Sequence, residues 1–147
     1  MINPADYLRL GFLMGGRARP AVDCYGLYRL IVGERLGVWI DEFGGVETPY
    51  AIARTMASGG TRPGWLTVAA GDERPFDMVM MRGVVGEGRA ARSAPLHVGC
   101  VIEPGRMIDI EETTGVMVRA YRDTARFSAL PTVVNRVTGL FRPAVLA

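Results

Sequence analysis

The spacing of apolar residues differs between the two parts of this chain of 147 residues. In the first part, apolar residues recur at helical spacing, as Leu27, Leu30 and Ile31 do. In the second part, short runs of alternating apolar and polar residues are separated by turn residues, which is typical of strands. Helices followed by strands predict a single α+β domain over residues 1–147, with N-terminal helices packed on a mainly antiparallel central sheet.

Start and stop signals set the expected bounds of the helices. Asp23 is expected at the N-cap of the helix that contains Leu27, and either Gly33 or Gly37 can end it. Thr48-Pro49 is typical of an N-cap and first helical position. The expected helices cover residues 4–12, residues 24 to 33 or 37, and residues 48–60. Trp39 and Phe43, in the loop between the last two helices, are expected to cover the edge of the core.

The second part of the chain predicts a largely antiparallel sheet. The expected strands cover residues 77–82, 96–102, 106–111, 115–121 and, at the end of the chain, 133–141. Residues 65–69 fit a strand or a helix, and residues 123–129 predict a short helix. Residues 83–95, rich in Gly, Arg and Ala, have no apolar period and are expected to form a cleft rim or a docking loop.

Composition excludes several classes of function. All 17 basic residues are arginine, so the chain can hold neither a P-loop lysine nor a Schiff-base lysine. The net charge of +2 is scattered along the sequence, which gives no basic patch typical of nucleic-acid binding. Two cysteines and one histidine are too few for a typical zinc site, and we expect no metal and no cofactor. No segment resembles a signal peptide or a membrane helix, so we expect folding in the cytosol without membrane insertion.

Cys24 is a candidate nucleophile because of its expected place in the first turn of a helix, directly after Asp23. The positive end of the helix dipole and the amides of the first turn favour a thiolate over a thiol, so a lowered pKa is expected for Cys24. The same amides could stabilise the oxyanion of a tetrahedral intermediate. The alternative is a buried structural cysteine, which is the commoner role of a free thiol.

A base for Cys24 has to be His97 or a carboxylate, because the chain holds no other histidine. On the strand that His97 begins, Gly99 shares its face and leaves open space there, whereas Val98 and Cys100 belong to the apolar face. This arrangement suits the wall of a cleft. The alternative is a histidine held in place by a backbone hydrogen bond.

The register of the following hairpin decides which carboxylate meets His97. A two-residue turn would place Asp109 opposite Cys100, on the wrong face; a three-residue loop with Gly105 in the left-handed conformation shifts the pairing by one. Asp109 would then lie diagonally from His97, close enough to accept the imidazole N–H, and Glu111 directly across from it. Glu111 is the substitute candidate. The alternative for both is solvated strand charge.

These motifs resemble the NlpC family of papain-like cell-wall peptidases, in particular the short forms encoded in phage tail gene clusters. Residues 23–27, Asp-Cys-Tyr-Gly-Leu, are similar to the family's Asp-Cys-Ser-Gly-Leu nucleophile motif, with Tyr as in tail-associated members. Residues 11–17 resemble its Pro-Tyr-x-x-Gly-Gly entry, and residues 74–79 its strand before the histidine. Residues 97–99, His-Val-Gly, followed by the hairpin that ends at Asp109, resemble the block that supplies the histidine and the third polar residue.

The resemblance implies a cysteine peptidase that cuts the peptidoglycan stem peptide, classically between D-glutamate and diaminopimelate. Cys24 would attack, His97 would act as the base and Asp109 would be the third catalytic residue. Asp23 would hold the free amino end of the stem. Phe12, in the place of a substrate-binding tyrosine, and Tyr25, in the place of a serine, would also line the substrate site.

The same resemblance implies partners and a location. A catalytic domain without its own secretion signal would reach the wall as part of a phage or phage-like tail tip, beside tail-tip or hub proteins, after synthesis in the bacterial cytoplasm. Two alternatives stay open. One is a catalytically silent tail component with the same fold, which the substitutions at Phe12 and Tyr25 favour. The other is an amidase or acyltransferase on this scaffold, since a triad does not fix the acyl group.

Overall fold

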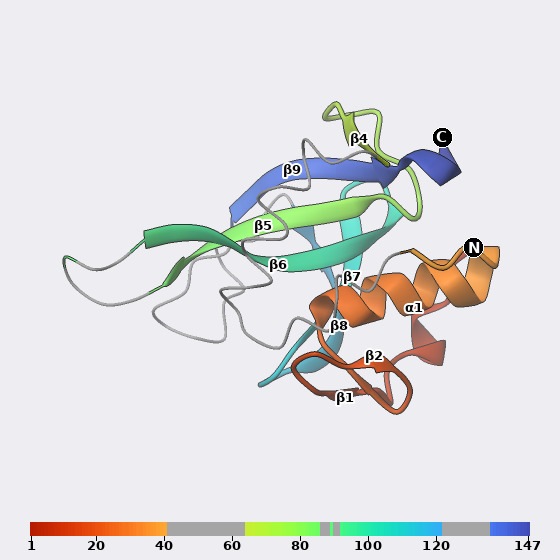
Figure 1. Ribbon diagram of the computed structural model, residues 1–147, viewed down its shortest axis with the longest axis vertical. Coiled ribbons are helices and arrows are strands. Elements are labelled where there is room, and N and C mark those ends of the chain that lie inside the picture. The colour runs from red at the N-terminus through yellow and green to blue at the C-terminus, as the bar shows by residue number, and fades with distance from the viewer. Residues whose placement is uncertain (41–63, 86–88, 90–91, 122–135) are drawn as a thin grey trace.

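The computed structural model describes residues 1–40, 64–85, 89, 92–121 and 136–147 (Figure 1). Within these residues one α-helix, α1 (Cys24–Leu36), packs on a six-stranded sheet with the order β4-β9-β5-β6-β7-β8. Every neighbouring pair in this sheet is antiparallel. The α+β class and the antiparallel sheet expected from the sequence are therefore confirmed.

The elements follow the chain in a simple order. The strands of the large sheet are β4 (Trp65–Val68), β5 (Met78–Val85), β6 (Arg92–Glu103), β7 (Arg106–Glu111), β8 (Gly115–Ala120) and β9 (Arg136–Pro143). A small sheet on the other side of α1 holds β1 (Gly11–Phe12), β2 (Arg17–Ala18) and β3 (Ala21–Val22) (Figure 1). Short 3₁₀ turns cover Pro4–Asp6 and Ala144–Leu146.

Helix α1 begins and ends where the sequence signals place it. The side chain of Asp23 accepts a hydrogen bond from the Gly26 amide at 2.7 Å, which is the expected N-cap. Gly37 ends the helix in the left-handed conformation, with φ of 69°. Gly33 lies inside the helix, and the ring of Trp39 packs against it: a Cβ atom at Gly33 would stand 2.4 Å from that ring.

Strand alternation divides the core between the two faces of the sheet. On the face toward α1, Leu27 and Ile31 pack in one cluster with Met80, Val98 and Ile108. A second cluster holds the residues of opposite orientation: Val79, Met81, Val101, Met107 and Leu140. Each such burial contributes about 1.5–3 kcal/mol, so this packing holds α1 against the sheet. Among the described residues no helix has the length and apolar character needed to cross a membrane.

Two expectations from the sequence are wrong. Residues 4–12 form a 3₁₀ turn and strand β1 rather than a helix, because Asn3 caps a single turn that closes at Tyr7. The loop expected over residues 83–95 is wrong at its two ends: residues 83–85 and 92–95 belong to β5 and β6, which stay paired as far as Val85 and Arg92, with one irregularity after Met81. Residues 86–88 and 90–91 lie outside the described residues. Cross-strand backbone pairing there overrides the low strand propensity of the Gly- and Ala-rich sequence.

The remaining expectations divide into two groups. Residues 65–69 form a strand, β4, and the chain ends in the expected strand, β9, which pairs with both β4 and β5. The expected helices at residues 48–60 and 123–129 and the expected position of Phe43 lie outside the described residues.

Candidate active site

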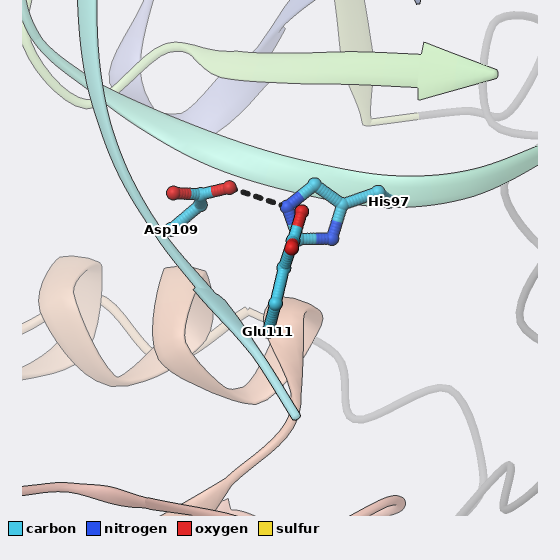
Figure 2. Close-up of side chains that lie close together, drawn as sticks. All are labelled: His97, Asp109 and Glu111. Carbon is cyan, nitrogen blue, oxygen red and sulfur yellow. Dashed lines mark hydrogen bonds and ion pairs between the residues drawn. The ribbon is translucent and has the colours of Figure 1, made fainter. Parts of the chain in front are cut away.

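The candidate site lies where β6 and β7 separate. Their ladder runs from the hairpin to the pair Cys100–Ile108; beyond it, β6 continues beside β5 and β7 beside β8. Figure 1 shows β7 crossing at a steep angle to β6, with α1 alongside both strands. Figure 2 shows the side chains of His97, from β6, and of Asp109 and Glu111, from β7, close together.

The register of the hairpin is the one that brings Asp109 to His97. Cys100 pairs with Ile108 rather than with Asp109, so Asp109 lies on the face of β7 from which its carboxylate reaches His97. The expected three-residue loop is wrong, however. Glu103 pairs with Arg106 across a two-residue turn, Gly105 has φ of 86°, and an irregularity between Val101 and Glu103 supplies the shift by one residue.

Gly99 does not leave open space beside His97, contrary to the sequence-based expectation. A Cβ atom at Gly99 would stand 2.5 Å from Sδ of Met107, which packs over this position. The glycine therefore admits a neighbouring core side chain, and His97 itself is buried.

His97 connects the nucleophile candidate to a carboxylate. Its Nε2 lies 2.5 Å from Oδ2 of Asp109, and Cys24 lies close enough to the imidazole to raise its pKa, so Nδ1 is the ring nitrogen that stays available to the thiol. Burial lowers the pKa of His97, but the hydrogen bonds and charges of Asp109 and Cys24 outweigh burial and raise it to about 10. The imidazolium is therefore the favoured form at neutral pH.

Asp109 is fully buried and is held by a second cation that the sequence analysis missed. Nε of Arg119, on β8, donates to both oxygens of Asp109 at 2.9 Å, and its Nη2 donates to Asp109 and, at 2.7 Å, to Glu111. Burial raises the pKa of Asp109, but hydrogen bonds from His97 and Arg119 lower it overall. A signal for Arg119 existed: Asp109 pairs with Met117, and Arg119 lies two residues further on the same face.

The ligand atoms of His97, Asp109 and Glu111 lie within 4.8 Å of one another, a spacing that could hold a metal ion. Arg119 already donates to both carboxylates from β8. A divalent cation would have to displace this guanidinium and take His97 from its hydrogen bond with Asp109. The donor set therefore fits an ion-pair network around a histidine better than a metal centre.

The segment around Cys24 is fixed by the carboxylate of Asp23, which is 1% exposed. Its Oδ1 accepts from Gly26 and lies 2.6 Å from Nη1 of Arg17, and its Oδ2 accepts from the Gly15 amide at 2.9 Å. Asp23 thus joins the glycine block at residues 15–17 to the start of α1. Contact with a substrate amine stays a prediction, and the amine would have to share this carboxylate with Arg17.

A close backbone contact at Gly26 joins the two sequence motifs, residues 11–17 and residues 23–27. A Cβ atom at Gly26 would stand 2.0 Å from the carbonyl oxygen of Gly16, which also accepts a hydrogen bond from the Asp23 amide at 3.3 Å. The absence of a side chain at Gly26 lets the chain at Gly16 lie directly against the first turn of α1. Cys24 is therefore presented by a helix start that is fixed from both sides.

The two aromatic candidates lie on either side of this segment. Tyr25 is buried, with Arg17 stacked 5.4 Å from its ring centroid and the ring of Tyr28 at 6.4 Å. Phe12 is half-buried on β1, paired with Val22 just before Asp23. Tyr25 thus packs inside the domain, so the exchange of a serine for this large ring is accommodated by the core.

A surface pocket of about 430 Å³ lies elsewhere, at the other end of α1. Its lining includes Leu36, the last residue of the helix, together with Phe76 and Arg142. Thirteen helical residues separate the two ends by about 18 Å, since a helix rises about 1.5 Å per residue. This pocket is therefore separate from the Cys24–His97–Asp109 cluster.

The fold around this cysteine–histidine–aspartate cluster is that of NlpC proteins. NlpC1 and NlpC2 from Trichomonas vaginalis superimpose with TM-scores of 0.55 and 0.52, at 17% and 15% identity, each over 93% of this chain. The chain spans only 40% and 42% of the length of these two proteins. The NlpC/p60 domain of the peptidoglycan hydrolase SagA gives a TM-score of 0.48 at 16% identity, over 92% of both chains.

No family model and no curated protein sequence matches this chain. At identities this low, the structural likeness establishes the fold. The activity has to be argued from the chemistry of the site.

Proposed function

We propose that this protein is a cysteine peptidase that hydrolyses peptidoglycan stem peptides, with Cys24 as nucleophile. The observation that carries the proposal is the hydrogen bond between His97 and the buried carboxylate of Asp109, with Cys24, in the first turn of α1, close enough to raise the pKa of His97. Three residues from separate parts of the sequence meet in the order that nucleophilic catalysis requires: nucleophile, base and a group that orients the base.

The arrangement supports acyl transfer in two steps. The Cys24 sulfur attacks the scissile carbonyl carbon, and the electron pair moves to the carbonyl oxygen. Amides in the first turn of α1, other than that of Gly26, which donates to Asp23, would stabilise this oxyanion. Collapse of the intermediate breaks the C–N bond, and the His97 imidazolium gives its proton to the leaving amine. Neutral His97 then takes a proton from water, which attacks the thioester and releases the acid and Cys24.

The choice of substrate rests on two independent supports. The fold is shared with NlpC proteins, and the motifs around Cys24 and His97 resemble those of NlpC cell-wall peptidases. We therefore propose the bond between D-glutamate and diaminopimelate as the scissile bond. Phe12, Tyr25 and Asp23, which surround the nucleophile in the sequence or in space, would shape the substrate site.

The test is a product analysis. Purified protein is incubated with peptidoglycan and with soluble stem peptides, and the products are read by mass spectrometry. A new amine on the diaminopimelate side is expected with the wild type and not with Cys24→Ala. Cys100→Ala is the matched control, because Cys100 is buried in the core and burial raises the pKa of its thiol; this variant should keep its activity.

The other outcomes separate the alternatives. A cut at another peptide bond would keep the peptidase and change the scissile bond. Cleavage of an amide outside the peptide would indicate an amidase instead, and an acyl group passed to an amine would indicate an acyltransferase. Absence of cleavage together with slow alkylation of Cys24 by iodoacetamide at neutral pH would favour the catalytically silent component. Absence of cleavage with fast alkylation would reject peptidoglycan as the substrate and keep the nucleophile.

Incorporation in a phage or phage-like tail tip is part of the proposal. Its support is the tyrosine of the Asp-Cys-Tyr-Gly-Leu motif at residues 23–27, which resembles tail-associated members of the family. Tail-tip or hub proteins would then be the partners. Mass spectrometry of purified particles should find the protein in stoichiometric amounts, and finding it only as a free species would reject this location.

A further inference from the structure

We infer that Arg119 is a positioning residue for the reaction, which fixes the carboxylate of Asp109 in the orientation that holds His97 toward Cys24. This inference rests on the proposed function in taking His97 as the base. It assigns a role to a residue on β8, a strand that supplies no other member of the cluster.

The contacts of Arg119 define this role. Asp109 receives only one hydrogen bond from His97, at Oδ2, and a carboxylate held at one oxygen can still rotate about its Cβ–Cγ bond. Nε of Arg119 lies 2.9 Å from both oxygens of Asp109, on a guanidinium that is itself almost fully buried. A planar donor group against both oxygens fixes the plane of the carboxylate, as a point charge would not.

Charge gives Arg119 a second effect on the same group. Asp109 and Glu111 point from the same face of β7 and lie close together beside His97 (Figure 2). Two neighbouring carboxylates raise each other's proton affinity, so one of them would tend to be protonated. Arg119 donates to both, and its hydrogen bonds to Asp109 help to lower the pKa of that carboxyl. Asp109 can then accept from His97 in its anionic form.

The charged groups around His97 make the effect measurable. In the described residues they are Cys24 from α1, Asp109 and Glu111 from β7, and Arg119 behind the two carboxylates from β8. Arg119 acts on His97 in two opposite ways. As a positive charge it opposes the imidazolium, whereas as a clamp on Asp109 it favours the imidazolium. The direction in which the titration of His97 moves when Arg119 is replaced tells the two apart.

The experiment is an NMR titration of the Cε1–H resonance of His97, which is the only histidine of the chain and so gives a single signal. Wild type, Arg119→Gln and Arg119→Lys are compared. In Arg119→Gln we expect the titration midpoint of His97 to fall by about one pH unit or more. A shift of this size follows when a histidine loses a close carboxylate partner. Arg119→Lys keeps the charge without the planar fork, and its midpoint is expected between the other two.

Arg142→Gln is the matched control. Arg142 makes a similar two-pronged pair with buried Asp77, at 2.6 and 2.7 Å, away from the cluster. Its loss should lower the melting temperature and leave the His97 midpoint unchanged. A downward shift in Arg142→Gln equal to that in Arg119→Gln would overturn the inference, because general loosening would then explain both.

An unchanged or raised midpoint in Arg119→Gln would also overturn it. If Arg119→Gln does not fold, Arg119→Lys decides: a lowered midpoint supports the inference and a wild-type midpoint refutes it. The titration needs no substrate, so it is independent of the cleavage assay. A protein that cuts no stem peptide but shows the shift would lose the proposed function and keep the role of Arg119.

Discussion

The contact between Gly26 and Gly16 gives a quantitative prediction. In Gly26→Ala the new methyl group would stand 2.0 Å from the Gly16 carbonyl oxygen, whereas ordinary contact begins near 3.4 Å. No side-chain rotation relieves a clash with backbone, so the loop has to move by about 1.4 Å, the difference between these two distances. That movement breaks the hydrogen bonds that Gly15 and Gly16 make with Asp23, at 2.9 and 3.3 Å.

The magnitude follows from these two bonds. Each broken bond at a buried partner costs about 1–2 kcal/mol, and replacing a helical glycine by alanine returns up to about 1 kcal/mol. We expect Gly26→Ala to lower the free energy of unfolding by about 2 kcal/mol. In a domain of this size that corresponds to a loss of about 6 °C in melting temperature. Because the first turn of α1 moves, alkylation of Cys24 by iodoacetamide should also slow.

Gly33→Ala is the matched control on the same helix. Its methyl group would meet the ring of Trp39, which is 55% exposed and can swing away into solvent. Its effect on the free energy of unfolding should stay within about 1 kcal/mol of zero, because helix propensity offsets the lost contact. Urea unfolding of both variants is the measurement. If Gly26→Ala proves as stable as Gly33→Ala, the close approach of Gly16 does not fix the start of the helix.

Two further predictions concern His97 and Asp23. The pKa of His97 is raised from 6.5 to about 10 in the folded protein, so its stabilisation is fully present below pH 6.5 and is lost as pH rises through about 10. The difference in melting temperature between wild type and His97→Gln should therefore shrink over this range, and a constant difference would contradict the raised pKa. Asp23→Ala removes the N-cap, which contributes about 1 kcal/mol, and also the buried carboxylate beside Arg17. We expect the free energy of unfolding, measured in urea, to fall by about 3 kcal/mol in total. Asp23→Asn should recover about 1 kcal/mol as the restored cap, and a loss below 1 kcal/mol in Asp23→Ala would show that Asp23 does not hold the two segments together.

Local signals predicted those parts of the fold that depend on neighbouring residues. Asp23 and Gly37 bound α1 because an N-cap and a left-handed C-terminal glycine act within one turn. The register of the His97 hairpin also followed from the sequence, since only one pairing places Asp109 on the face of His97. The irregularity at residue 102 that produces this register could not be predicted, because it leaves no mark in the order of apolar and polar residues.

Long-range contacts account for what the sequence did not predict. Arg119 and Arg17 appear in the sequence as ordinary surface charges, and only the folded chain brings them to Asp109 and Asp23. The pairing of Gly83 with Ala94 likewise depends on the partner strand, since neither residue favours a strand by itself. The space beside Gly99 was assigned to a cleft, and Met107 fills it from the next strand.

The separation of β6 and β7 has a consequence for how the protein acquires its chemistry. Cys24 and His97 are about seventy positions apart in the sequence, and no short segment contains both. Contacts so distant along the chain form slowly, because the intervening chain must be closed into a loop first. A newly made chain therefore carries Cys24 apart from His97 until α1 packs on β6 and β7. Reactivity then arises together with the completed fold, as a cooperative property of the whole domain.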